Sequence, residues 1–337
     1  MKTCYSSVMN VKNDRKSALK KLRNLMLSPK IEIDKFREKI ENSFANPFVP
    51  NGVEVEERNY GNVNCTYLSP KVYFSSRVIF YIHGGSFCGG SAASYRSFCA
   101  SLANAASCRV IVPEFRLPPA HPFPAALEDM EAVFKSYFIQ EEVECKINGA
   151  SPCSIVIMAD GSGASIACGA LQKCIDKERI GRVKQLVLFS PWLDFSEDTY
   201  VFKLKHQKDE LITAEGIRRA VDMYTYQSNA GNPLVSPLKM KSEDIQSFPP
   251  VYIQCGEKEI FLEQAKDFSE KLEFNGVECT VEIVKNMMGM FQLADEFLNE
   301  SHLAVEEVGK FITKREQFDI HELAQREHQL KINNIRQ

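Results

Sequence analysis

Short apolar runs alternate with longer segments whose apolar residues recur at helical spacing. The runs are typical of buried strands, which we expect around 53–60, 63–68, 77–82, 108–115, 153–158, 184–192, 250–256 and 279–284. Amphipathic segments predict helices at 15–27, 32–44, 94–106, 123–138, 164–175, 261–274 and 299–312 and after residue 214. Apolar strands that alternate with amphipathic helices predict a doubly wound, mostly parallel sheet with both faces covered. The expected fold class is therefore α/β.

Composition and charge exclude several classes of function. The 337 residues are 44% hydrophobic and 25% charged, as in ordinary globular proteins, and the net charge of −3 leaves no basic field for nucleic acid or an anionic membrane. No apolar window reaches the length of a membrane span, and the amino terminus has no export signal. The 11 cysteines show no metal-ligand spacing. We expect reduced thiols in the cytoplasm, no metal and no cofactor.

Four motifs follow the predicted strands in order. They read HGGSFCGG (83–90), EFRLPPAHPFPAALED (114–129), ADGSGAS (159–165) and PPVYIQCGEKEIFLEQA (249–265). Together they resemble the motifs of the hormone-sensitive-lipase-like carboxylesterases, a branch of the α/β-hydrolase fold, over roughly residues 50–312. The resemblance implies a hydrolase domain over 51–313, with a helical cap formed by residues 1–50 and by an insertion at about 198–230. A helical tail over 314–337 would follow.

The first motif matches the oxyanion loop of that family, His-Gly-Gly-Gly, with Ser86 in place of the last glycine. The resemblance implies that His83, Gly84, Gly85 and Ser86 surround the carbonyl of a substrate or ligand. Small residues let the backbone approach a carbonyl closely, so we expect the N–H groups of Gly84 and Gly85 to be free to meet an oxyanion.

The third motif matches the turn that carries the nucleophile, Gly-Asp-Ser-Ala-Gly-Gly in the family. Alignment without a gap places Gly161 at the nucleophile and Ser162 one position later. A shift of one residue turns a side chain by about 100° on the helix that follows, so Ser162 is a weak alternative nucleophile. We expect its hydroxyl to cap the helix and its N–H to be the second oxyanion donor.

The fourth motif places Glu259 at the acid position, where a glutamate can orient an imidazole as an aspartate does. The base position falls on Gly289, in a loop that reads KNMMGMFQ and contains no histidine. The next histidine along the chain, His302, lies in the following predicted helix and is expected at the surface.

Glycine at both positions removes the hydroxyl and the imidazole that triad catalysis requires. We therefore expect a pseudoenzyme that binds a small apolar or ester-like molecule in the former acyl pocket. This expectation loses its basis if Phe87, Met287 or Met290 fill that pocket.

Two alternatives remain open. One is a weak esterase that uses Ser162 or a water activated by Glu259. The other is a scaffold or oligomer subunit, because the tail carries an apolar stripe at Ile320, Leu323 and Leu330 that is suited to self-association.

Overall fold

The computed structural model of the chain describes residues 14–45, 49, 52–73, 76–203 and 209–314. Their strands form one sheet in the order β1-β2-β4-β3-β5-β6-β7-β8. The strands are β1 (Val53–Tyr60), β2 (Val63–Pro70), β3 (Arg77–Ile82), β4 (Arg109–Pro113), β5 (Ser154–Asp160), β6 (Val183–Phe189), β7 (Val251–Gly256) and β8 (Cys279–Val284). These strands coincide with the predicted apolar runs to within a few residues.

Pairing is antiparallel from β1 to β2 and from β2 to β4, and parallel across the rest of the sheet. In the centre, β3 pairs with β5 in register from Arg77 opposite Ser154 to Ile82 opposite Ala159. All residues of β3 and β7 are buried, which explains why both strands are almost continuously apolar. The predicted mostly parallel α/β sheet is confirmed.

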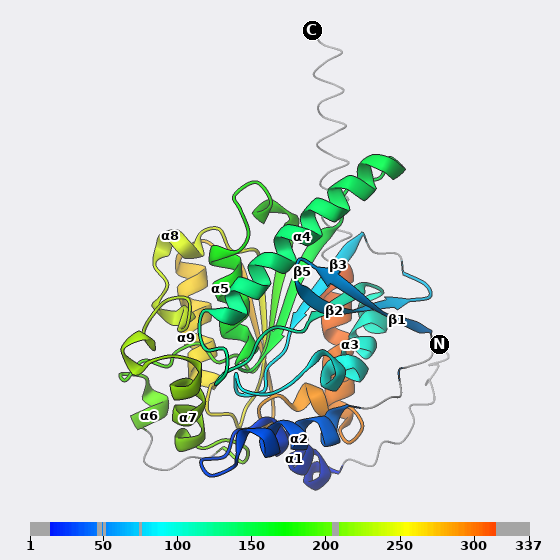
Figure 1. The fold of residues 1–337 in the computed structure, drawn as a ribbon. Helices are drawn as coiled ribbons and strands as arrows, with labels where there is room; N and C mark the ends of the chain where they lie inside the picture. Colours follow the sequence, from blue (N-terminus) through cyan, green and yellow to red (C-terminus); the bar gives the residue numbers. More distant parts are fainter. Residues whose placement is uncertain (1–13, 46–48, 50–51, 74–75, 204–208, 315–337) are drawn as a thin grey trace, which may run out of the picture.

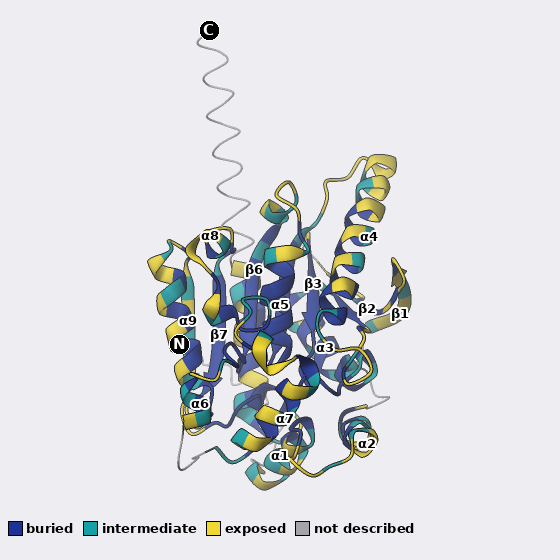
Figure 2. Cartoon of the chain, turned by 60° about the vertical axis from the view of Figure 1, so that its left-hand side comes forward, coloured by how far each residue is buried: buried dark blue, intermediate teal, exposed yellow. Residues whose placement is uncertain are grey.

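Helices cover both faces of the sheet (Figure 1). One face carries α4 (Ala125–Asn148), α5 (Gly163–Lys173) and α9 (Leu262–Phe274), and the other carries α3 (Ala92–Ala106) and a helix over 299–314. Helix α4 runs ten residues beyond its predicted end at 138, until Gly149 ends it in the left-handed conformation. Its last turns project from the body and are largely exposed (Figure 2).

A second group of helices lies across the lower end of the sheet in Figure 1. It comprises α1 (Arg15–Leu22), η1 (Arg23–Leu25), α2 (Ile33–Phe44), α6 (Tyr200–Lys203) and α7 (Ala214–Tyr224). The remaining short elements are η2 (Ile180–Arg182), η3 (Gln227–Asn229), η4 (Pro237–Lys239), α8 (Ser242–Ile245) and η5 (Phe291–Ala294). Within the described residues we find no helix whose length and hydrophobicity would let it cross a bilayer.

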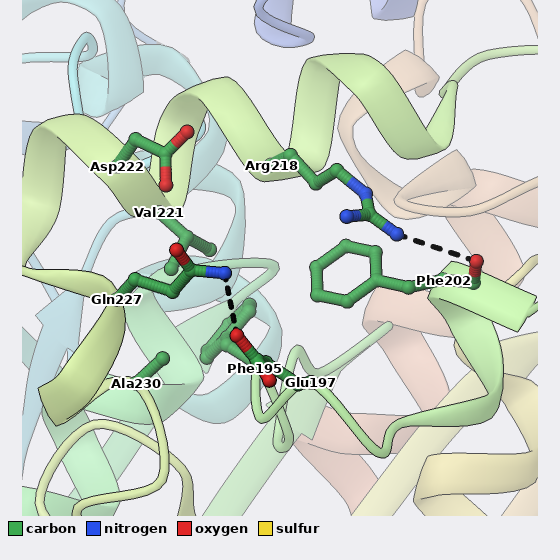
Figure 3. A pocket seen from close by; sticks show the side chains of 8 residues that line it. All are labelled: Phe195, Glu197, Phe202, Arg218, Val221, Asp222, Gln227 and Ala230. Atoms are coloured by element: carbon green, nitrogen blue, oxygen red, sulfur yellow. Dashed lines mark hydrogen bonds between the residues drawn. The ribbon is translucent and has the colours of Figure 1, made fainter.

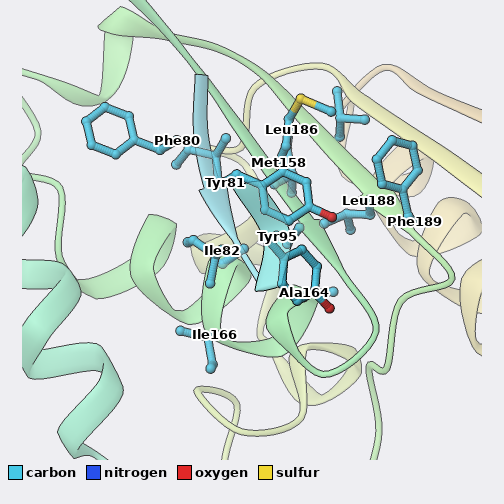
Figure 4. Close-up of a cluster of buried hydrophobic side chains, with 14 of the residues drawn as sticks. Phe80, Tyr81, Ile82, Tyr95, Met158, Ala164, Ile166, Leu186, Leu188 and Phe189 are labelled. Atoms are coloured by element: carbon cyan, nitrogen blue, oxygen red, sulfur yellow. The ribbon is translucent and has the colours of Figure 1, made fainter. Parts of the chain in front are cut away.

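The centre of the core is a cluster of buried hydrophobic side chains that includes Tyr81 and Tyr95 (Figure 4), and the hydroxyls of these two tyrosines bond to a buried carboxylate. The side chain of Asp160, at the end of β5, accepts hydrogen bonds of 2.9 Å from the hydroxyls of Tyr81 and Tyr95 and from the N–H of Gly84. Burial raises the pKa of Asp160 to about 6. These bonds tie β3, β5 and α3 together directly beneath the loops that follow the strands.

Candidate active site

Five loops meet at the carboxyl ends of β3, β5, β6, β7 and β8. The loop after β3 spans residues 83–90. The loops after β5, β6, β7 and β8 contain Gly161, Ser190, Glu259 and Gly289, respectively. Because the carboxyl ends of parallel strands lie at the same edge of a sheet, this edge is where α/β proteins build their sites. Helices α1, α2 and α7 lie over the same edge (Figure 1).

Gly161 occupies the sharp turn between β5 and α5. Its φ of +48° lies in the left-handed region that favours glycine. Its N–H donates to the carbonyl of Phe189, and its carbonyl accepts from the N–H of Trp192, both at 3.0 Å. A Cβ added here would lie 3.1 Å from the Sδ of Met290. The thioether therefore occupies the space that a side chain at position 161 would need.

Ser162 is buried, and its hydroxyl points to the preceding loop. The Oγ accepts a 2.8 Å hydrogen bond from the N–H of Phe87, and no N–H of α5 donates to it. The predicted helix cap is therefore wrong, because the loop after β3 lies closer to this hydroxyl than the first turn of α5. Among the described residues, no imidazole or carboxylate forms a hydrogen bond with the hydroxyl.

The 83–90 loop offers fewer free donors than predicted. The N–H of Gly84 donates to Asp160, so it is not free to meet an oxyanion and the prediction for Gly84 is wrong. Gly85 has a φ of +101°, and a Cβ there would lie 2.3 Å from the carbonyl oxygen of Gly89, so only glycine fits. In the described part of the chain, the N–H groups of Gly85 and Ser162 have no acceptor.

His83 supports this loop from within the core. Its ring stacks between Tyr95, 5.2 Å away, and Phe115, 4.4 Å away, and its Nδ1–H donates to the carbonyl of Gly84. Burial lowers the pKa of His83 to about 4, so the ring is neutral near pH 7. A ring enclosed in this way positions the loop and does not itself face a ligand.

Ser86 connects the 83–90 loop to the amino-terminal helices. Its Oγ donates to the carbonyl of Leu25 at 3.0 Å and accepts from the N–H of Leu27 at 3.1 Å. The guanidinium of Arg37, on α2, also donates to the carbonyl of Cys88. These contacts hold the amino-terminal segment over the site. The Ser86 hydroxyl makes two of them, at a position where the oxyanion loop of the hormone-sensitive-lipase-like family has glycine.

We expect Ser86→Ala to lower the free energy of unfolding by about 1–3 kcal/mol, because it leaves the two backbone groups of Leu25 and Leu27 without partners. Ser86→Gly loses the same bonds but suits the φ of +54° better, so it should cost less. Urea unfolding measures both values. Hydrogen exchange of residues 23–27 should accelerate in both variants, and unchanged exchange would show that these bonds do not hold the segment.

Glu259 lies after β7 and is buried. Its Oε2 accepts from the hydroxyl of Ser190 at 2.7 Å and from the N–H of Gly256 at 3.1 Å, whereas its Oε1 is buried with no partner among the described residues. Burial, with a smaller contribution from the nearby carboxylate of Asp209, raises the pKa of Glu259 to about 7. The carboxyl group bonds to a serine at the point where the resemblance places a histidine.

The loop after β8 brings Gly289 against Glu259. A Cβ at Gly289 would lie 3.4 Å from the Oε2 of Glu259, an ordinary contact, so the backbone leaves room for a Cβ here. The next residue, Met290, has a φ of +52°, and its N–H donates to the hydroxyl of Ser190 at 2.7 Å. This bond fixes the backbone that directs the Met290 thioether toward Gly161.

Side chains fill the space in front of the turn. Phe87 stacks on Tyr224 of α7, with ring centroids 4.0 Å apart, and meets Phe195 edge-on at 5.3 Å. Phe87, Met287 and Met290 are all buried. The cavity between Glu259, Gly289 and Met290 measures about 10 Å³, and a single water needs about 10–15 Å³. Among the described residues, this cavity is therefore too small for the ligand predicted in the former acyl pocket.

A larger cavity lies on the other side of Phe195 (Figure 3). It measures about 340 Å³, and its apolar wall consists of Phe195, Phe202, Val221 and Ala230. Its polar rim consists of Glu197, Arg218, Asp222 and Gln227. The guanidinium of Arg218 lies over the ring of Phe202, 4.4 Å from its centroid, and the amide of Gln227 donates to Glu197 at 2.6 Å.

Ser190 was not predicted as part of the site, and Met290 was predicted only as a residue that could fill the acyl pocket. Ser190 belongs to the segment SPWLDFS and has a φ of +46°, a strain that no sequence pattern reveals. Met290 belongs to the methionine-rich segment NMMGMF. Flexible thioethers fill irregular gaps, so the three methionines beside the base position were the one available signal.

The sheet order, the glycine turn after β5 and the loops at the carboxyl ends define a protein of the α/β-hydrolase class. A family profile described as alpha/beta hydrolase fold matches residues 79–293. An esterase of Acinetobacter venetianus is 30% identical over 71% of this chain and 75% of its own length. An acetyl-hydrolase of Streptomyces hygroscopicus is 27% identical over 82% of this chain and 87% of its own length.

The fold agrees with solved structures. An esterase from the bacterial hormone-sensitive lipase family superposes with a TM-score of 0.76 and 25% identity, over 89% of this chain and 97% of that one. This chain belongs to the α/β-hydrolase fold family, and its relatives include esterases of the hormone-sensitive lipase kind.

Proposed function

We propose that this chain is a non-hydrolytic member of its family that binds a small, mostly apolar molecule. The observation that carries the proposal is the Met290 sulfur, 3.1 Å from the place of a Cβ on residue 161. Gly161 has no hydroxyl to acylate, and Gly289 has no imidazole to deprotonate one. In subtilisin, removal of either group alone costs about 10⁶-fold in kcat. The turn at Gly161 therefore lacks the groups that triad-catalysed ester hydrolysis requires.

The ligand site that we propose is the cavity in Figure 3 rather than the former acyl pocket. Its volume of about 340 Å³ falls within the range of about 300–1,000 Å³ that is typical of small-molecule sites. An apolar wall with a few polar groups at the rim is the usual composition of such sites. Phe195 separates the two spaces, so a ligand in this cavity rests against the aromatic cluster that fills the former one.

The first expected result concerns hydrolysis. We expect no adduct with a fluorophosphonate probe by intact-mass spectrometry, and no turnover of p-nitrophenyl acetate or butyrate beyond that of heat-denatured protein. Ser162→Ala is the matched control, because it removes the one hydroxyl next to the turn. Turnover that disappears in Ser162→Ala would refute the proposal and make the chain an esterase with a displaced nucleophile.

The second expected result concerns binding. Anilinonaphthalene sulfonate, an apolar dye with one charge, should bind the wild type with increased fluorescence. Ala230→Leu places a larger side chain into the cavity and should weaken this binding at least about tenfold, since it removes the buried contact area of the dye. Ala150→Leu, at an exposed loop position, should leave it unchanged. Equal binding by the three proteins would place the dye elsewhere and refute the site.

One observation favours a second candidate, a hydrolase that uses a water activated by Glu259. The Oε1 of Glu259 has no partner among the described residues and lies beside a cavity of about one water. Turnover in the ester assay that is lost in Glu259→Gln but kept in Ser162→Ala would select this candidate. The scaffold alternative depends on the stripe at Ile320, Leu323 and Leu330, which lies outside the described residues. Chromatography of the chain ending at Lys314 against the full chain tests it.

A further inference from the structure

A third cavity lies at the amino-terminal edge of the sheet, at the end opposite to the candidate active site. It measures about 430 Å³ and lies between the second half of α4 and strands β1, β2 and β4. Its lining includes Arg58, Tyr60, Tyr67, Arg109 and Tyr137, and the exposed residues Asn59, Gln140 and Glu144 also line it. The volume suits a small molecule, and nothing in the hydrolase fold requires a hollow here.

The guanidinium of Arg109 is the unusual group in this cavity. It donates to the Sγ of Cys153 at 2.8 Å and to the hydroxyl of Tyr67 at 3.5 Å, and it lies 5.1 Å from the ring centroid of Tyr73. Its Nε is buried without a partner among the described residues. No described carboxylate lies within ion-pair distance of it. Arg109 is half-buried. Because charges that are partly removed from water are normally paired, a guanidinium held only by neutral groups points to an anion as its partner.

The other charged groups around the cavity largely compensate one another. Arg58 pairs with Glu56 at 2.8 Å. The carboxylate of Glu141 binds Arg182 and also accepts from the hydroxyl of Tyr137. The carboxylate of Glu144 is exposed at the rim, where water screens it. The interior therefore retains one uncompensated positive charge, at Arg109.

The neutral part of the lining favours a polar ligand. Tyr60, Tyr67 and Tyr137 are buried and line the cavity with rings that carry hydroxyls. The ring of Tyr67 also lies between the two cations: Arg58 stacks 3.6 Å from its centroid, and Arg109 bonds to its hydroxyl. Amides at Asn59 and Gln140 complete a wall in which donors and acceptors are mixed.

We propose that this cavity binds a small polar metabolite through one carboxylate or phosphate group, which pairs with Arg109. A guanidinium presents its donors as a planar fork that matches both kinds of oxyanion. The tyrosine hydroxyls and rim amides then contact the rest of the ligand. This site is independent of the proposed function, because it shares no residue with the cavity beside α7 or with the 83–90 loop.

Isothermal titration calorimetry at constant ionic strength tests the site, with sodium phosphate and sodium benzoate as probes. We expect the wild type to bind at least one probe, and Arg109→Gln to weaken that binding at least about tenfold, since a hydrogen-bonded charge is removed. Arg23→Gln removes an equal charge at an exposed position over the candidate active site and should bind as the wild type does.

Gln140→Trp provides a second variant that is safe for folding, because Gln140 is exposed on α4. The bulky ring at the rim should block both probes, and circular dichroism melting verifies that each variant is folded. Binding of phosphate alone identifies a phosphate ligand, and binding of benzoate alone identifies a carboxylate ligand. Binding of neither probe, or equal binding in folded Arg109→Gln, overturns the proposal.

Discussion

The Gly161→Ser/Gly289→His double variant is expected to remain unlabelled by a fluorophosphonate, whereas addition of Met290→Ala should allow labelling. The reason is the position of the Met290 thioether, 3.1 Å from the place of a Cβ at residue 161. A Cβ at 289 makes only ordinary contacts, the nearest with the Oε2 of Glu259 at 3.4 Å. We expect the triple variant to label at least about 10²-fold faster than the double variant, because the histidine introduced at 289 can act as general base only once the hydroxyl introduced at 161 has room beside it.

Intact-mass spectrometry over time gives both labelling rates. The matched control is Gly161→Ala/Gly289→His/Met290→Ala, which opens the same space without a hydroxyl and should not label. If the double variant labels as fast as the triple variant, Met290 is not what closes the site. If the folded triple variant stays unlabelled, the turn at Gly161 differs from a hydrolase turn in more than its side chains.

The second large effect is a pH dependence of stability that originates in Glu259. The folded protein raises the pKa of Glu259 from its usual 4.5 to about 7, so between these values the folded state binds more protons than the unfolded state. Stability from this group therefore falls as pH rises from about 4.5 to 7. Over this range the shifted carboxyl group should lower the free energy of unfolding of the wild type by up to about 3 kcal/mol. Glu259→Gln has no carboxyl group to titrate, so this part of the decrease should be absent from the variant.

Urea unfolding at pH 5 and pH 8 measures this difference. Glu54→Gln is the control, because Glu54 is exposed on β1 and its replacement should leave the pH dependence as in the wild type. The buried Asp160 contributes with the same sign, between its usual 3.8 and about 6, and does so equally in all three proteins. Identical pH dependence in the wild type and Glu259→Gln would show that the carboxyl group stays ionised when it is buried.

The position of the two larger cavities among the described residues bears on the family relationship. The relatives are named esterase and acetyl-hydrolase, and their likeness to this chain covers the strands and loops that build a hydrolase site. In this chain the cavity beside Glu259 and Gly289 measures about 10 Å³. Space for ligands lies instead beside α7 and beneath α4.

The sequence by itself determined the sheet, its helices and the identity of the residues at the critical positions. Apolar runs such as 77–82 and 251–256 form strands because burial on both faces demands a largely hydrophobic sequence, a property that is visible locally. Glycine at 161 and 289 is likewise a fact of the chain, and the motif order was enough to align both residues with a triad.

Only the tertiary structure decided what occupies the space around those positions. Met290 and Ser190 are 100 positions apart, and Ser86 bonds to a carbonyl 61 positions away, so their contacts depend on strand order and loop geometry. The hydroxyl of Ser162 bonds to Phe87 rather than to its own helix for the same reason. Local patterns encode which residues are buried, but packing between distant segments decides whether a pocket is open or filled, because van der Waals contact depends on separations of a few ångströms.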